Sequence, residues 1–215
     1  MNRRFSSHFF WGSHSPFAAL SATALIILSS GRLAYAIICA SAVIWVYVLT
    51  ALVYSASLPI MPLRGRVIIL LFLLSFFCGI FFMIIGMINP LLILGSSFFL
   101  VLIPVWCISS NFFEASESFE LMDIVTRALL ESASLGGIII AFSLIREPIG
   151  IGTLSFPGGV QGIIEIFGNF ETNPNTFFPA RIVSVTSGGL LLFGYATALF
   201  RYFKEQNGFS IGDSR

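Results

Sequence analysis

The stretch from residue 67 to residue 113 lies between Arg66 and Glu114 and carries no charged side chain. A helix that crosses a membrane needs about 20 apolar residues, so this run is too long for a single crossing. Asn89-Pro90 lies near its middle, and such a pair typically interrupts a helix. We therefore expect two crossings, at residues 67–88 and 91–110, joined as a tight helical hairpin.

The same criterion predicts four further spans, at residues 16–30, 33–56, 128–145 and 182–200. The first is short for a full crossing, and Arg146-Glu147-Pro148 is expected to stop the fifth. Hydrophobic residues make up 57% of the chain and charged residues 10%, whereas a soluble domain carries about a quarter charged residues. The sequence thus predicts an all-α membrane protein with six spans in a single domain, residues 1–215. Its net charge of +1 argues against a nucleic-acid partner.

The distribution of basic residues predicts the orientation, because cytoplasmic loops are enriched in Lys and Arg. Six crossings place both termini on one side. That side would hold more basic residues than the other, so we expect both termini in the cytoplasm. Arg3-Arg4 and Ala34-Tyr35-Ala36 imitate a cleaved signal peptide, but the polar residues 5–15 are too long for its first part. We expect the first span to be retained. The basic residues on the terminal side are Arg3, Arg4, Arg64, Arg66, Arg201 and Lys204.

Two segments outside the spans differ in character. Residues 112–131 carry acids at helical spacing, which indicates either a solvated helix face or a mouth that collects cations. Residues 147–179 are rich in glycine and proline and are expected to form a loop. Within that loop, Gly150-x-Gly152 lacks the other features of a phosphate-binding turn. The acids of the first segment are Glu114, Glu117, Glu120, Asp123 and Glu131.

Arg146 and Glu147 stand out as adjacent charges where a span meets a proline. One interpretation is anchoring at the membrane interface with local capping of the helix end. The other is a role in an ion path or a subunit contact, because charged residues at membrane depth usually face protein or water. His8 and His14 both precede the first span, and the chain shows no spacing typical of a self-contained enzyme active site.

The three cysteines all lie in apolar runs. Cys107 follows Pro104 by three residues, and a proline inside a helix removes a backbone hydrogen bond. We therefore expect the helix to be kinked or broken beside Cys107. Cys39 and Cys78 are expected to behave as small buried hydrophobic residues, which is also the simplest interpretation of Cys107.

Several segments resemble the membrane subunits of Rnf complexes and of the sodium-pumping NADH:quinone reductase. Residues 143–154, Ser-Leu-Ile-Arg-Glu-Pro-Ile-Gly-Ile-Gly-Thr-Leu, resemble the segment (V/L)RE-x-x-G-x-GTL of the RnfE/NqrD branch. Leu135-Gly136-Gly137 resembles the glycine-rich part of the helix before it. Residues 103–107 resemble the PLIV-x-NC segment, Glu114 matches the acid of GRAEA, and Trp11 resembles the start LW-x-NN. The likeness covers nearly the whole chain.

This resemblance implies a 3+3 inverted repeat in which the first and fourth spans are half-helices that meet at mid-membrane. It also implies a homologous six-span partner, RnfA/NqrE-like, with which the chain would share an iron–sulfur cluster held by four cysteines. Cys107 matches one of those ligands, but Ala24 stands at the position of the other, and alanine cannot ligate iron. Trp106 and Phe112 replace the family's Asn and Arg. No SGAT pattern is present, so no flavin is expected on this chain.

The resemblance implies a membrane subunit of an ion-translocating electron-transport complex, pumping Na⁺ or H⁺ in the cytoplasmic membrane of a bacterium. Two other functions remain open. A carrier or channel without redox chemistry would need a polar binding point near Ala24 and Cys107. A structural scaffold would present small residues to another protein. The small residues in question are Gly136, Gly137, Gly188 and Gly189.

Overall fold

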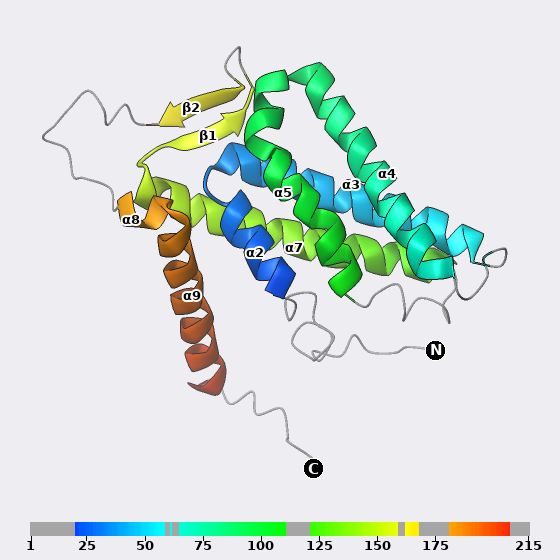
Figure 1. Ribbon diagram of the computed structural model, residues 1–215. Helices are drawn as coiled ribbons and strands as arrows, with labels where there is room; N and C mark the ends of the chain where they lie inside the picture. The colour runs from blue at the N-terminus through cyan, green and yellow to red at the C-terminus, as the bar shows by residue number, and fades with distance from the viewer. Residues whose placement is uncertain are drawn as a thin grey trace, which may run out of the picture.

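The computed structural model describes residues 20–58, 61, 65–110, 121–158, 162–167 and 181–206 (Figure 1). These residues are mostly helical. Four helices, α3, α4, α5 and α7, are long and apolar enough to cross a membrane. The elements are α2 (Leu20–Ser29), α3 (Leu33–Ser57), α4 (Arg66–Ile88), α5 (Pro90–Ser109), α7 (Leu121–Gly150), β1 (Leu154–Pro157), β2 (Ile163–Phe167), α8 (Arg181–Ser184) and α9 (Thr186–Gln206).

The expected hairpin between the third and fourth spans is confirmed by α4 and α5. Asn89 separates the two helices and caps the second, because its side chain accepts a hydrogen bond of 3.1 Å from the Leu91 N–H. Pro90 occupies the first helical position, where its missing N–H has no helical partner to lose. The outer face of this hairpin is apolar and exposed, as expected for helices that face lipid. Its exposed side chains include Ile68, Phe72, Met83, Met87, Leu94, Phe98 and Val101.

The centre of the fold is the pair formed by α3 and α7, which lie side by side in Figure 1. The two helices are antiparallel, because Leu33 lies near Glu147 and Tyr47 near Glu131. Between these points, Gly136 faces Ala40, and a Cβ added at this glycine would lie 3.2 Å from the Ala40 Cβ. Glycine is therefore the residue that allows the two helices to approach closely at this point.

The fifth span is longer than the sequence indicated. We expected it to stop before Pro148, but α7 continues to Gly150 and contains this proline. A proline in the last turn removes a single intrahelical hydrogen bond, so the helix tolerates it there. The chain leaves the helix at Gly152, whose φ of 78° favours glycine, and the Gly152 N–H donates to the Glu147 carbonyl at 3.2 Å.

The fourth span also differs from the expectation. α5 has 20 residues, enough for a whole crossing rather than a half-helix, and it is not broken at Pro104. The proline leaves the Leu100 carbonyl without its helical donor, and the Cys78 thiol of α4 donates to that oxygen at 3.3 Å. A side chain from the neighbouring helix thus replaces the missing backbone hydrogen bond.

The sixth span is interrupted where a continuous helix over residues 182–200 was expected. α8 ends at Ser184, Val185 lies outside both helices, and α9 begins at Thr186. Figure 1 shows α9 projecting away from the other helices. The described part of α2, the first span, has ten residues. Neither α2 nor α9 is among the four helices long and apolar enough to cross a membrane.

Part of the expected loop at residues 147–179 forms a β-hairpin instead. β1 and β2 are antiparallel, with Phe156 opposite Ile164, and the Gly158 N–H donates to the Gly162 carbonyl at 3.0 Å. Gly158 and Gly162 both have positive φ, which suits the turn between the strands. The signal for these strands is their content of β-branched and aromatic residues, and the surrounding glycines and prolines obscured it.

Candidate functional site: polar residues on the buried face of helix α7

The buried face of α7 carries five polar side chains among its apolar ones. Ile124, Ala128, Leu135 and Ile139 recur at helical spacing and define this face. Polar groups in such a position are unfavourable unless they find partners, so each contact is informative. The five polar residues are Glu131, Ser132, Ser143, Arg146 and Glu147.

Arg146 is 2% exposed and uses all five N–H bonds of its guanidinium. Nε donates to the Val183 carbonyl at 2.9 Å. Nη1 donates to the Ile27 carbonyl at 2.6 Å and to the Ser30 hydroxyl at 2.9 Å. Nη2 donates to the carbonyls of Ser184 and Val185, both at 3.0 Å. The acceptors are all neutral oxygens of this chain.

These contacts explain why the sixth span is interrupted at Val185. The carbonyls of α8 and of the residue after it turn towards Arg146, which binds them together with the last turn of α2. A cation is favourable at the carboxyl end of a helix, where carbonyls lack intrahelical donors. Gly189 of α9 lies directly against the guanidinium, and a Cβ added there would be 2.6 Å from Arg146 Cζ. Arg146 therefore joins α2, α8 and α9 to α7.

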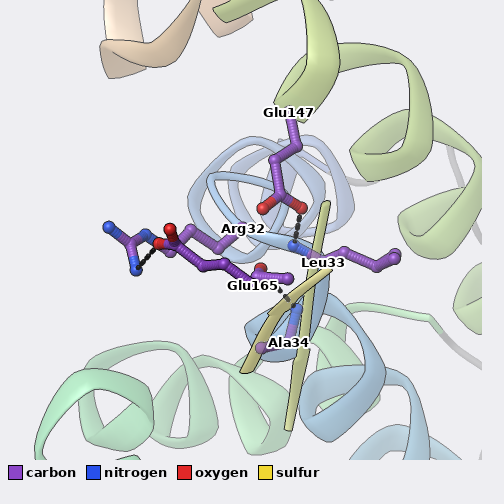
Figure 2. Close-up of polar contacts among 6 residues, drawn as sticks. Arg32, Leu33, Ala34, Glu147 and Glu165 are labelled. Atoms are coloured by element: carbon purple, nitrogen blue, oxygen red, sulfur yellow. Dashed lines mark hydrogen bonds and ion pairs between the residues drawn. The ribbon is translucent and has the colours of Figure 1, made fainter. Parts of the chain in front are cut away.

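Glu147 points to a different place, the first turn of α3 (Figure 2). Its Oε2 accepts a hydrogen bond of 2.6 Å from the Leu33 N–H, and Ser155 Oγ accepts one of 3.3 Å from the Ala34 N–H. Arg32 itself provides no side-chain cap to this helix. An anion at a helix amino terminus is favourable, so Glu147 and Ser155 act as a cap supplied from distant parts of the chain.

The two adjacent charges are thus not partners of each other. Arg146 and Glu147 are 2% and 1% exposed, which does not fit anchoring at a membrane interface. Local capping of the helix end, the other part of that interpretation, is not what Glu147 does, because the helix that it caps is the distant α3. Beside this cap, Arg32 and Glu165 approach to 3.5 Å with both side chains well exposed, so their ion pair contributes little to stability (Figure 2).

Glu131 forms a second polar centre on α7, sixteen residues before Glu147. It is 8% exposed, and its Oε2 accepts a hydrogen bond of 2.7 Å from the Tyr47 hydroxyl. The same hydroxyl lies 3.2 Å from Ser110 Oγ, and Ser110 donates to the Cys107 carbonyl at 2.8 Å. The rings of Tyr47 and Trp106 pack against each other at 5.0 Å between centroids, with a tilt of 34°. This chain of oxygens links α7, α3 and the carboxyl end of α5.

The expectation of a solvated face therefore fails for Glu131, while Asp123 of the same acidic segment is exposed. The residue lies in phase with Leu135, Ile139 and Phe142, and this spacing was the signal that could have placed it inside. Glu114, Glu117 and Glu120 lie outside the described residues.

The residues around Cys107 do not fit a cluster held by two cysteines of this chain. Cys107 is fully buried, and Ala24, on the neighbouring helix α2, has no donor atom. Cys78 donates to a backbone carbonyl and Cys39 is buried in α3. Within the described residues, no three side chains of His, Cys, Asp or Glu gather as a metal-binding group.

The glycines of the family-like segment serve close contacts rather than nucleotide binding. Gly150 ends α7 against α8, and a Cβ added there would lie 2.8 Å from the Ser184 nitrogen. Gly136, Gly188 and Gly189 likewise face atoms of this chain, whereas Gly137 has open space beside it. Most of the small residues considered for a contact with another protein are therefore occupied within the chain.

No protein-family model matches this sequence, and neither does any of the curated proteins compared with it.

Proposed function

We propose that the chain is a membrane subunit of an ion-translocating electron-transport complex of the Rnf/Nqr type, located in a bacterial cytoplasmic membrane. The observation that carries this proposal concerns residues 146–154, which most resemble this family. These residues form the junction of the fold: Arg146 joins α2, α8 and α9, Glu147 caps α3, and the buried Thr153 leads into β1. Few sequences can make all of these contacts at once. The likeness of this segment to the family therefore supports a shared fold.

The proposed architecture is six crossings in a 3+3 inverted repeat, with α3 and α7 as the second and fifth spans. Its support is the antiparallel pairing of these two helices through the centre of the chain. Equivalent spans of an inverted repeat run in opposite directions and meet at the repeat interface. In this proposal α2 provides the shortened first span, and α8 with α9 provides an interrupted sixth.

The proposed partner is a homologous six-span subunit, accompanied by subunits that carry flavin or iron. We expect that no complete four-cysteine cluster forms at the interface with this chain, because Ala24 cannot donate to iron. The chain has no proposed catalytic step of its own, and its part in the complex is to hold the ion path.

Purification of the tagged chain from its native membrane in a mild detergent tests this function. The homologous subunit and the redox subunits should co-purify, and reconstituted vesicles should form a Na⁺ or H⁺ gradient when NADH or reduced ferredoxin is supplied. Glu165→Gln, which removes an exposed carboxylate, is the control and should retain the partners. Iron and sulfide analysis should find less than a full cluster at this interface. A colourless chain without redox partners would contradict the proposal.

The orientation of the chain gives a separate prediction. Basic residues concentrate on the side of Arg64 and Lys204, so reporter fusions placed after these residues should both read as cytoplasmic. A fusion at Asn89, in the turn between α4 and α5, should read as external. The reverse pattern would overturn the orientation while leaving the helices as described.

A carrier or channel without redox chemistry is the second candidate. The observation that favours it is the buried Glu131 with Tyr47 and Ser110 beside Cys107, because such a function needs a polar binding point in this region. This candidate predicts that vesicles containing the chain alone exchange ions without an electron donor. The scaffold alternative is weakened, because Gly136, Gly188 and Gly189 contact residues of their own chain.

A further inference from the structure

Glu131 is a carboxylate inside a helix long and apolar enough to cross a membrane. It lies one turn after Arg127 on the buried face of α7 and is 8% exposed, so protein surrounds it. An ionised carboxylate buried in this way is unfavourable unless a cation or a proton compensates its charge. The Tyr47 hydroxyl, at 2.7 Å, donates a hydrogen bond but brings no positive charge.

The groups around the carboxylate are oxygens suited to a small cation. They are the hydroxyl of Tyr47, the hydroxyl of Ser110 and the carbonyl of Cys107, connected by distances of 3.2 and 2.8 Å. Carboxylate, hydroxyl and carbonyl oxygens are the ligands that hard cations prefer, and the carboxyl ends of helices coordinate Na⁺ or H⁺ in transporters.

The carboxyl end of α5 also favours a cation at this place. Ser110 is the cap residue of that helix, and the last turn of α5 contains no basic side chain that would neutralise its carbonyls. The charged and titratable groups near the carboxylate within the described residues are Arg127 on α7, Tyr47 on α3 and Cys107 on α5. Arg127 lies one turn from Glu131 and is half-buried, so solvent reduces its effect on the deeper carboxylate.

A further polar group lies one turn beyond Tyr47 on the same buried face of α3. Thr50 is fully buried, and its hydroxyl has no hydrogen-bond partner in the part of the chain that the structure describes. A buried polar atom without a partner calls for an explanation such as a bound ion or water.

We propose that Glu131, Tyr47 and Ser110 form an exchangeable site for a monovalent cation, H⁺ or Na⁺. Glu131 supplies the charge, and Tyr47 with Ser110 orients the carboxylate towards the end of α5. In placing this site within a pumping cycle, the inference rests on the proposed function. The binding itself does not need that function and can be tested alone.

Labelling of the purified full-length chain with dicyclohexylcarbodiimide tests the site, because this reagent attacks protonated carboxyl groups in apolar surroundings. Glu131 should be labelled, and the label should disappear in Glu131→Gln. Asp123→Asn, which changes an exposed acid of the same helix, is the matched control and should leave the label unchanged. Tyr47→Phe should label faster at neutral pH, because the ionised carboxylate loses a hydrogen-bond donor.

The two cations are distinguished by adding NaCl or KCl at constant ionic strength. At a Na⁺ concentration of ten times Kd, mass action slows the labelling about tenfold if Na⁺ occupies the site. A labelling rate that depends on pH but not on Na⁺ assigns the site to H⁺. A labelling rate that depends on neither pH nor Na⁺, or labelling that persists in Glu131→Gln, overturns the proposal. Cation-dependent labelling in a chain that purifies without redox partners would retain this site and reject the electron-transport function.

Discussion

Replacing Arg146 by lysine should destabilise the chain and prevent its assembly, although both side chains are cationic. The guanidinium donates five hydrogen bonds, to oxygens of α2, of Ser30 just after it, of α8 and of Val185 between α8 and α9. An ammonium group has three donors and lacks the planar fork, so at least two buried acceptors lose their partner. Each such loss costs about 1–3 kcal/mol of the free energy of unfolding.

The measurement for this variant combines insertion into the membrane with the thermal unfolding of the protein in detergent. Arg146→Lys should insert normally but unfold at a lower temperature and retain fewer partner subunits. Arg32→Lys is the matched control, because the Arg32 side chain is 40% exposed and its ion pair with Glu165 is open to solvent. Its effect should stay within about 0.5 kcal/mol. If Arg146→Lys behaves as the control does, the five hydrogen bonds of the guanidinium do not stabilise the fold.

The second large effect is expected for Gly189→Ala in α9. Alanine is normally favoured over glycine in a helix by about 1 kcal/mol. Here the new Cβ would lie 2.6 Å from Arg146 Cζ and 2.8 Å from its Nη2. The guanidinium cannot move aside without losing hydrogen bonds to the carbonyls around Val185. Gly189→Ala should therefore lower the unfolding temperature and release α9 from α7.

Gly194→Ala provides the control for this variant within the same helix. Nothing lies within 4 Å of a Cβ added at Gly194, so this change should be neutral or slightly stabilising. Combining Gly189→Ala with Arg146→Lys adds a second comparison. Both changes act on one set of contacts, so the double variant should be less destabilised than the sum of the single variants. If Gly189→Ala and Gly194→Ala have the same unfolding temperature, the close contact between Gly189 and the Arg146 guanidinium is wrong.

Much of the helical framework could be predicted from local sequence. The charge-free residues 67–113 predicted two long apolar helices, and Asn89-Pro90 placed the turn between them correctly. The second span was predicted to within one residue of α3. These features depend on the length of apolar runs and on the conformational limits of proline, which neighbouring residues alone determine.

The predictions from local sequence failed where a residue far away in the chain provided a hydrogen-bond partner. Pro104 was expected to kink or break its helix, but α5 continues through it, and the Cys78 thiol of α4 donates to the carbonyl that this proline leaves free. Residues 182–200 were expected to form one helix, but Arg146 binds the carbonyls at which the chain is interrupted. Glu131 was grouped with solvated acids because its partner Tyr47 lies 84 residues earlier in the chain.

The sequence by itself therefore determined that the chain forms long helices apolar enough to cross a membrane, where most of these helices lie, and that Arg146-Glu147 is an unusual pair of charges. The tertiary structure alone decided what these charges do. Arg146 binds the Ile27 carbonyl across 119 positions, and Glu147 binds the Leu33 N–H across 114. These partners are backbone groups, which every residue carries, so no pattern of side chains can reveal them. Only the packing of α2, α3 and α8 against α7 brings them within hydrogen-bonding distance.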